Sequence, residues 1–189
     1  MKKIILSLLS VFLLSGHYAK AEAQVVTSNS GIVILQVYIP RLMSVLNLTQ
    51  DNLFVNELAQ KKCVVALNYL ATGKDEVTQE SKGLLNVLCG LPINTNINPS
   101  LSLSSSEKKT IQSLISSAIA QWPSVGDMNN DGLRSTFLIR PGVLEESQGQ
   151  WDLTVERRVY DVLIHRSPFT FSNIKFNWMS KNLYVHWNF

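Results

Sequence analysis

The stretch Pro141–Glu156, which reads PGVLEESQGQWDLTVE, decides the fold class of this chain. It opens with a Pro-Gly pair typical of a turn, and two short runs with β-forming residues follow, separated by the polar segment Ser147–Gln150. In the second run apolar and polar residues alternate, which gives a strand one apolar face. We therefore predict a β-hairpin formed by Val143–Glu146 and Trp151–Glu156.

The clearest helix precedes this hairpin. Ser104–Glu107 has the sequence SSSE, a capping box in which a serine hydroxyl and a glutamate satisfy amide groups at the start of a helix. Apolar residues then recur at spacings of three and four, which places them on one helical face. Pro123 ends the pattern. We predict a helix over Glu107–Gln121.

Other helices are predicted on both sides of this one. Asp51 is a candidate cap for a helix that runs to about Leu70, where Gly73 follows as a stop signal. Leu84–Leu88 reads as a short helix, and so does Leu133–Arg140. Near the end of the chain, Val159–His165 is predicted to form a helical turn.

The remaining segments complete the fold class. Gln24–Ser30 reads as a polar connector, and Asn182–Trp187 as a strand. Ile32–Ile39 is apolar and rich in β-branched residues, so its propensity favours a strand without deciding between strand and helix. Helices early and strands late predict an α+β fold: a bundle of short helices packed with a small antiparallel β-hairpin or sheet in the C-terminal half.

Composition bounds the class of protein. The chain has 189 residues, 46% of them hydrophobic and 16% charged, which excludes wholesale disorder and suits a single packed domain. The net charge of +3 arises from three lysines close to the N-terminus, and beyond Ala21 acidic and basic residues balance. A balanced, dispersed charge does not support nucleic-acid binding, so no nucleic-acid partner is predicted.

The first 23 residues have the pattern of a signal peptide. Two lysines follow Met1, Ile4–Ser15 is apolar, and small residues favour cleavage after Ala21 or Ala23. The apolar run is about a dozen residues, whereas a helix that spans a bilayer needs about 20. We predict a leader at residues 1–23, a single domain at residues 24–189, export to the periplasm or the exterior, and no stable membrane span after cleavage.

One segment fits the first half of a calcium-binding loop. Asp127–Gly132 has the pattern D-x-N-x-D-G, but the twelfth position of the loop, which needs a bidentate carboxylate, is Leu138. Asn or Asp side chains followed by glycine also cap a turn that leads into a helix. We predict the capped turn and no metal site.

No catalytic or cofactor-binding residues are predicted. His165 and His186 have no recognisable nucleophile motif near them, and we expect them at surface or strand positions. Cys63 and Cys89 each lie in an apolar helical pattern, where a free thiol packs as a small hydrophobe. In an exported chain the same two cysteines would form one disulfide. The sequence leaves both states open.

Aromatic residues crowd the last part of the chain. Large rings dominate protein cores, and they also dominate interfaces. The chain ends shortly after these rings, which leaves little sequence to cover all of them. We therefore predict that some of them contact a protein partner; the candidates are Phe169, Phe171, Trp178, Tyr184 and Trp187.

Three stretches carry a family resemblance: Gly31–Leu42 (GIVILQVYIPRL), Leu84–Asn94 (LLNVLCGLPIN) and Gln121–Trp187. Together they resemble the C-terminal region of the tape measure proteins of contractile injection systems, which are phage-tail-like syringes assembled by bacteria. In that family the segment at Ile32–Ile39 leads into a helix that continues from Pro40, and the type of Ile32–Ile39 itself stays open. The resemblance also implies a structural, non-enzymatic assembly role, without cofactors, in which this region engages the tube-initiating hub or the baseplate; tube components are further expected partners.

Two features depart from that family. A tape measure is long, whereas 189 residues would span only about 280 Å even as one continuous helix. The chain therefore resembles the terminal folded module alone. The family also assembles in the cytoplasm, while the leader predicts export. An exported protein-binding domain that uses its aromatic C-terminal end is the alternative function.

Overall fold

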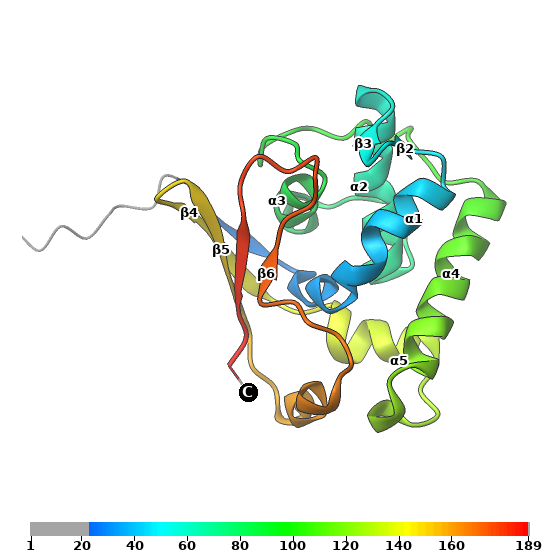
Figure 1. Ribbon diagram of the computed structural model, residues 1–189, viewed down its shortest axis with the longest axis vertical. Helices are drawn as coiled ribbons and strands as arrows, with labels where there is room; N and C mark the ends of the chain where they lie inside the picture. Colours follow the sequence, from blue (N-terminus) through cyan, green and yellow to red (C-terminus); the bar gives the residue numbers. More distant parts are fainter. Residues whose placement is uncertain (1–22, 189) are drawn as a thin grey trace, which may run out of the picture.

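The computed structural model describes residues 23–188, and they form an α+β fold, as predicted. Figure 1 shows a twisted sheet with helices gathered along one side of it. The sheet has five strands in the order β1-β4-β5-β7-β6. Their bounds are β1 Ala23–Thr27, β4 Gly142–Ser147, β5 Gln150–Val155, β6 Asn173–Ile174 and β7 Leu183–His186. A second, two-stranded sheet pairs β2 (Thr49–Gln50) with β3 (Leu53–Phe54).

Short helices make up the rest of the fold. The α-helices are α1 Ile39–Val45, α2 Glu57–Thr72, α3 Gln79–Leu88, α4 Ser105–Ala120 and α5 Asn130–Leu133. The 3₁₀ helices are η1 Ser30–Tyr38, η2 Pro123–Val125 and η4 Val159–Arg166, and η3 (Arg134–Leu138) is a π-helical turn. In the described part of the chain, no helix is long and apolar enough to cross a membrane.

The centre of the fold is η1, and the segment Ile32–Ile39, whose type the sequence left open, is helical: it forms most of η1 and the first residue of α1. Residues 30–35 are completely or almost completely buried. Gly31 allows this placement, because a Cβ atom built on it would lie 1.7 Å from the carbonyl oxygen of Phe137. Only the absence of a side chain lets η1 pack directly on η3.

Local capping signals predicted α4 correctly and α2 only in part. Ser104 and Glu107 form the predicted capping box at the start of α4. Gly73 ends α2 in the left-handed conformation, with φ of 75°, as predicted. The predicted N-cap of α2 is wrong: Asn56 accepts the cap hydrogen bond from the Ala59 amide, while Asp51 lies in a turn with φ of 52°.

The sheet differs from the prediction in two ways. Gln24–Ser30 is not a polar connector, because β1 pairs antiparallel with β4 along its whole length. The sheet is also mixed, since β5 and β7 pair in parallel. The predicted hairpin is present, but its turn is tighter than expected: Ser147 and Gln150 pair directly, so the loop is Gln148-Gly149.

The other elements follow the prediction with shifted ends. The short helix at Leu84–Leu88 begins earlier, at Gln79, and η4 and β7 occupy the predicted positions. The helix predicted at Leu133–Arg140 is divided between α5 and η3. Residues 1–22 lie outside the described part of the chain, and Ala23, the last residue of the predicted leader, is the first residue of β1.

Candidate functional site

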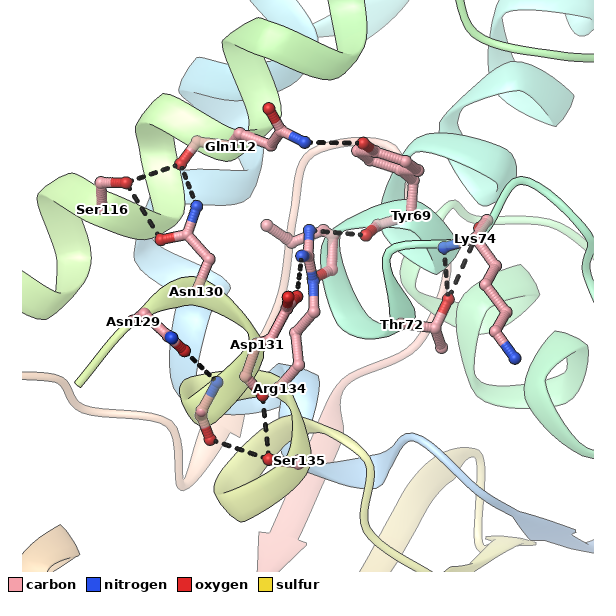
Figure 2. A network of polar contacts seen from close by, with 12 residues as sticks. Tyr69, Thr72, Lys74, Gln112, Ser116, Asn129, Asn130, Asp131, Arg134 and Ser135 are labelled. Atoms are coloured by element: carbon pink, nitrogen blue, oxygen red, sulfur yellow. Dashed lines mark hydrogen bonds and ion pairs between the residues drawn. The ribbon is translucent and has the colours of Figure 1, made fainter.

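The motif Asp127–Gly132 forms the predicted capped turn (Figure 2). The Asn129 side chain accepts a hydrogen bond of 2.8 Å from the Gly132 amide and caps α5. Asp131 points to Arg134 and pairs with it at 2.9 Å. Among residues 23–188, no group of three or more His, Cys, Asp and Glu side chains is arranged to hold a metal ion.

Arg134 connects this turn to α2 (Figure 2). Its guanidinium donates hydrogen bonds to the carbonyl oxygens of Tyr69 (3.3 Å) and Leu70 (3.2 Å), close to the end of α2. The same group lies 5.6 Å from the centre of the Tyr69 ring. A cation is favourable near the carbonyl end of a helix, so this buried arginine joins α2 to α5. The network is structural.

A buried ion pair between Arg140 and Asp161 connects the segment that follows η3 to η4. One Arg140 nitrogen lies 2.9 and 3.0 Å from the two carboxylate oxygens of Asp161, and the side chains are 0% and 1% exposed. The Trp187 indole donates to the same carboxylate at 2.9 Å, and so does the Arg158 amide at 2.8 Å. Four hydrogen bonds therefore hold Asp161 and, through it, the start of η4.

The side of η4 that faces away from the ion pair carries an exposed apolar stripe. In a 3₁₀ helix residues three apart lie on the same face. Asp161 and Ile164 thus face the core, at 1% and 4% exposure, whereas Val159 and Val162 face outward, at 94% and 63%. The core-facing side of η4 is fixed by Asp161 and Ile164. The two valines on its other side are exposed and do not contribute to the core, as is typical of residues in a binding site.

Basic residues flank this stripe. A groove of about 590 Å³ runs along it, lined by Arg157, Arg158, Val159, Asp161, Val162 and His165. The Asp161 charge is balanced from beneath by Arg140, and Glu156 pairs with Arg158 at 3.0 Å. Arg157, two residues before η4, and Arg166, the last residue of η4, are both exposed. The groove therefore combines the two exposed valines with a lining that is mainly basic.

A second groove of about 350 Å³ adjoins the first at His165 and contains three of the five predicted partner residues. Phe169, Phe171 and Trp187 line it together. Phe169 and Trp187 are buried, at 8% and 5% exposure, and Phe171 is half-buried with its ring 5.7 Å from that of Trp187. We call the Val159–Val162 stripe and these two grooves the η4 surface.

The other two predicted partner residues lie elsewhere. Trp178 packs against Phe54 and Phe176, with ring centres 4.9 and 5.2 Å away, and its indole donates to the Leu88 carbonyl oxygen. Tyr184 is half-buried on β7. The five aromatic residues therefore do not form one surface.

The histidines occupy the predicted kinds of position. His165 is exposed on η4 and His186 lies on β7, where it is 2.9 Å from Asp152. Burial alone would raise the pKa of Asp152, but hydrogen bonds from His186, Gln150 and Ser147 outweigh it and hold that pKa below its usual value. This arrangement stabilises a carboxylate on the sheet.

Sequence reasoning missed the exposed valines of η4 and the Arg140–Asp161 pair. The two charged residues are 21 positions apart, and no local spacing rule connects them. One signal was present: both lie in the stretches that carry the family resemblance. The valines lie in the same stretch, but nothing in the sequence indicated their exposure, because an apolar helical turn normally predicts burial.

The comparisons with known proteins give one match. The family model described as contractile injection system tape measure protein matches residues 15–187. No curated protein and no solved structure matches the chain.

Proposed function

Because the chain belongs to the family of contractile injection system tape measure proteins, we propose that its folded body is a non-enzymatic assembly module that binds a protein of the tube-initiating hub or the baseplate. The two longest described helices have 16 residues each, a length of about 24 Å. A body built from such short elements suits a contact at one end of a tube better than a role in spanning it.

The observation that carries this proposal is the exposure of Val159, 94%, on a helix whose other face is fixed by a buried ion pair. A protein partner that covers Val159 and Val162 removes apolar surface from water at little conformational cost, because the helix is already ordered. The η4 surface is therefore the proposed binding site.

The basic residues near the stripe suggest the chemistry of the partner. Arg157 and Arg166 flank the stripe, so the complementary surface presents apolar side chains together with carboxylates. Phe171 at the adjoining groove offers a further ring for contact. Phe169 and Trp187 contribute the floor of that groove, whereas a role for Trp178 and Tyr184 requires a partner that reaches the sheet and α3.

A matched pair of variants tests the surface. Val162 on η4 and Leu58 on α2 are both 63% exposed, so Asp at either position replaces an apolar side chain of the same exposure. We expect Val162→Asp to weaken binding to purified hub or baseplate protein at least about tenfold, and Leu58→Asp to leave it unchanged. Calorimetry on the full chain measures both. Equal affinities for the two variants would contradict the assignment of the η4 surface.

The alternative role, an exported protein-binding domain, is favoured by the open aromatic groove at Phe171. It uses the same surface for an envelope or extracellular protein. Cell fractionation with mass spectrometry of the N-terminus separates the two roles. A chain cleaved after Ala21 or Ala23 and recovered outside the cytoplasm supports the exported domain. An intact chain that co-purifies with tube or baseplate proteins supports assembly.

A further inference from the structure

Cys63 and Cys89 come together in the core from two different helices. Cys63 lies in α2 and Cys89 is the residue at which α3 ends. Their sulfur atoms are in contact at 2.6 Å, and both residues are 0% exposed. The structure contains them as free thiols.

The end of α3 is held in place from two sides. From α2, the Gln60 side chain donates a hydrogen bond of 2.9 Å to the Cys89 carbonyl oxygen; Gln60 lies one turn before Cys63. From the other side, the Trp178 indole donates to the Leu88 carbonyl oxygen at 2.9 Å. Gly90 adopts φ of 71°, and a Cβ there would lie 2.2 Å from the Trp178 carbonyl oxygen. The two sulfur atoms are therefore kept in contact by a backbone that is held in place on both sides.

We propose that Cys63 and Cys89 form a disulfide-bonding site that joins α2 to the end of α3 when the chain folds in the presence of a disulfide oxidant. A metal is not the better explanation, because no third His, Cys, Asp or Glu joins the pair within residues 23–188. This proposal does not depend on the function of the η4 surface.

The reaction is a pair of thiol–disulfide exchanges. One cysteine thiolate attacks the disulfide of the oxidant, forms a mixed disulfide and releases the first oxidant thiolate. The second cysteine thiolate attacks the cysteine sulfur of that mixed disulfide, which forms the Cys63–Cys89 bond and releases the second oxidant thiolate. The two thiols lose two protons and two electrons, and the oxidant disulfide is reduced to two thiols.

Burial determines when this reaction occurs. The thiolate is the reactive species, and burial together with the neighbouring Cys63 raises the pKa of the Cys89 thiol well above its usual range. Both thiols are also closed to an oxidant in the folded chain. The bond therefore forms during folding or transient opening of the α3 end, and its presence records the redox conditions under which the chain folded.

Refolding the full chain under two redox conditions tests the proposal. The reduced, denatured chain is refolded with oxidised and reduced glutathione, and in parallel with dithiothreitol. With glutathione we expect a monomer lighter by two hydrogen atoms, a Cys63–Cys89 peptide pair in a non-reducing digest, and an unchanged circular dichroism spectrum. The unfolding midpoint is expected to rise by about 5 to 10 °C relative to the dithiothreitol sample.

Single variants provide the control and the contrary outcome. Cys63→Ala and Cys89→Ala each leave one cysteine, so neither gains a linked peptide or a higher midpoint with glutathione. The proposal is overturned if the refolded wild-type monomer keeps two alkylatable thiols. It is also overturned if glutathione yields only mixed adducts or cross-linked dimers, or if the linked monomer has lost the native spectrum.

Discussion

Arg140 and Asp161, 21 residues apart in the chain, form an ion pair from which solvent is almost entirely excluded. Arg140 also donates hydrogen bonds to the carbonyl oxygens of Thr136 and Glu156, and its guanidinium lies 5.2 Å from the centre of the Trp187 ring. The pair thereby connects η3, the end of β5, η4 and the last tryptophan. The proposed binding helix is anchored by this connection.

Asp161→Asn is expected to lower the free energy of unfolding by about 3 kcal/mol or more, because it leaves the buried Arg140 charge without its partner. Urea unfolding followed by circular dichroism measures the change. Glu156→Gln is the control, since it removes one acid from the Arg158–Glu156 pair, whose side chains are 31% and 48% exposed. That change should cost less than about 1 kcal/mol. Similar losses of unfolding free energy in both variants would show that the buried Arg140–Asp161 pair contributes no more to stability than the exposed pair.

Gly31→Ala is expected to cost about 3 kcal/mol or to prevent folding, because its Cβ would lie 1.7 Å from the Phe137 carbonyl oxygen. The comparison is Gly149→Ala in the hairpin loop, where φ is 79° but nothing lies within 4 Å of the added Cβ. That change should cost about 1 kcal/mol from backbone conformation alone. Denaturant titrations of both variants decide the matter, and a Gly31→Ala protein as stable as wild type would refute the tight packing of η1 on η3.

Glu107 gives a stability term that depends on pH. Burial alone would raise the pKa of Glu107, but its ion pair with Lys62 at 2.6 Å and its hydrogen bonds with Ser104 outweigh burial and lower that pKa below its usual value. A group with a lowered folded-state pKa stabilises the fold above its unfolded pKa, and that contribution is lost as the pH falls through the folded-state value. Glu107 therefore stabilises the fold at neutral pH and not in strong acid.

Glu107→Gln is expected to cost about 1 kcal/mol near pH 7, and the difference from wild type should shrink as the pH falls below about 4. Gln preserves the length of the side chain and can still accept from the Ser104 amide, so the comparison isolates the charge. Unfolding free energies measured in urea across the pH range provide the test. A difference that stays constant down to about pH 3 would mean that the carboxylate charge is not its source.

The parts of the fold that were predicted correctly depend on local signals. Ser104 and Glu107 are three residues apart, so their capping box can be recognised from a single turn of sequence. The strand β1 was missed because its pairing partner β4 lies more than 100 residues away. Its own five residues, AQVVT, are too few to show a clear strand pattern. Register with a distant strand is a tertiary property that propensity does not contain.

The same distinction applies to the candidate site. Crowding of aromatic residues near the end of the chain was visible, and three of the five predicted partner residues do line one groove. The sequence could not separate rings that pack inward from those that remain accessible, because Trp187 is covered by contacts with Arg140 and Asp161, which lie in two other segments of the chain. The exposure of Val159 depends likewise on where Asp161 is anchored.

Trp187→Ala and Phe171→Ala should therefore affect different properties, although their rings lie 5.7 Å apart. Trp187 is 5% exposed and its indole donates to Asp161, so its loss leaves a cavity beneath η4 and an acceptor with one donor fewer. We expect it to cost about 3 to 5 kcal/mol of unfolding free energy. Phe171 is half-buried at the mouth of the groove, and its removal should cost about 1 kcal/mol while weakening partner binding.

Urea unfolding and calorimetric binding, measured on both variants, separate the two roles. If the Trp187→Ala chain unfolds like wild type but no longer binds, Trp187 contacts the partner and does not stabilise η4. If Phe171→Ala instead lowers the unfolding free energy and leaves the affinity for the partner unchanged, the groove is part of the core. The binding site then consists of the Val159–Val162 stripe alone. With the expected result, the buried tryptophan holds the helix, and the exposed ring and valines contact the partner.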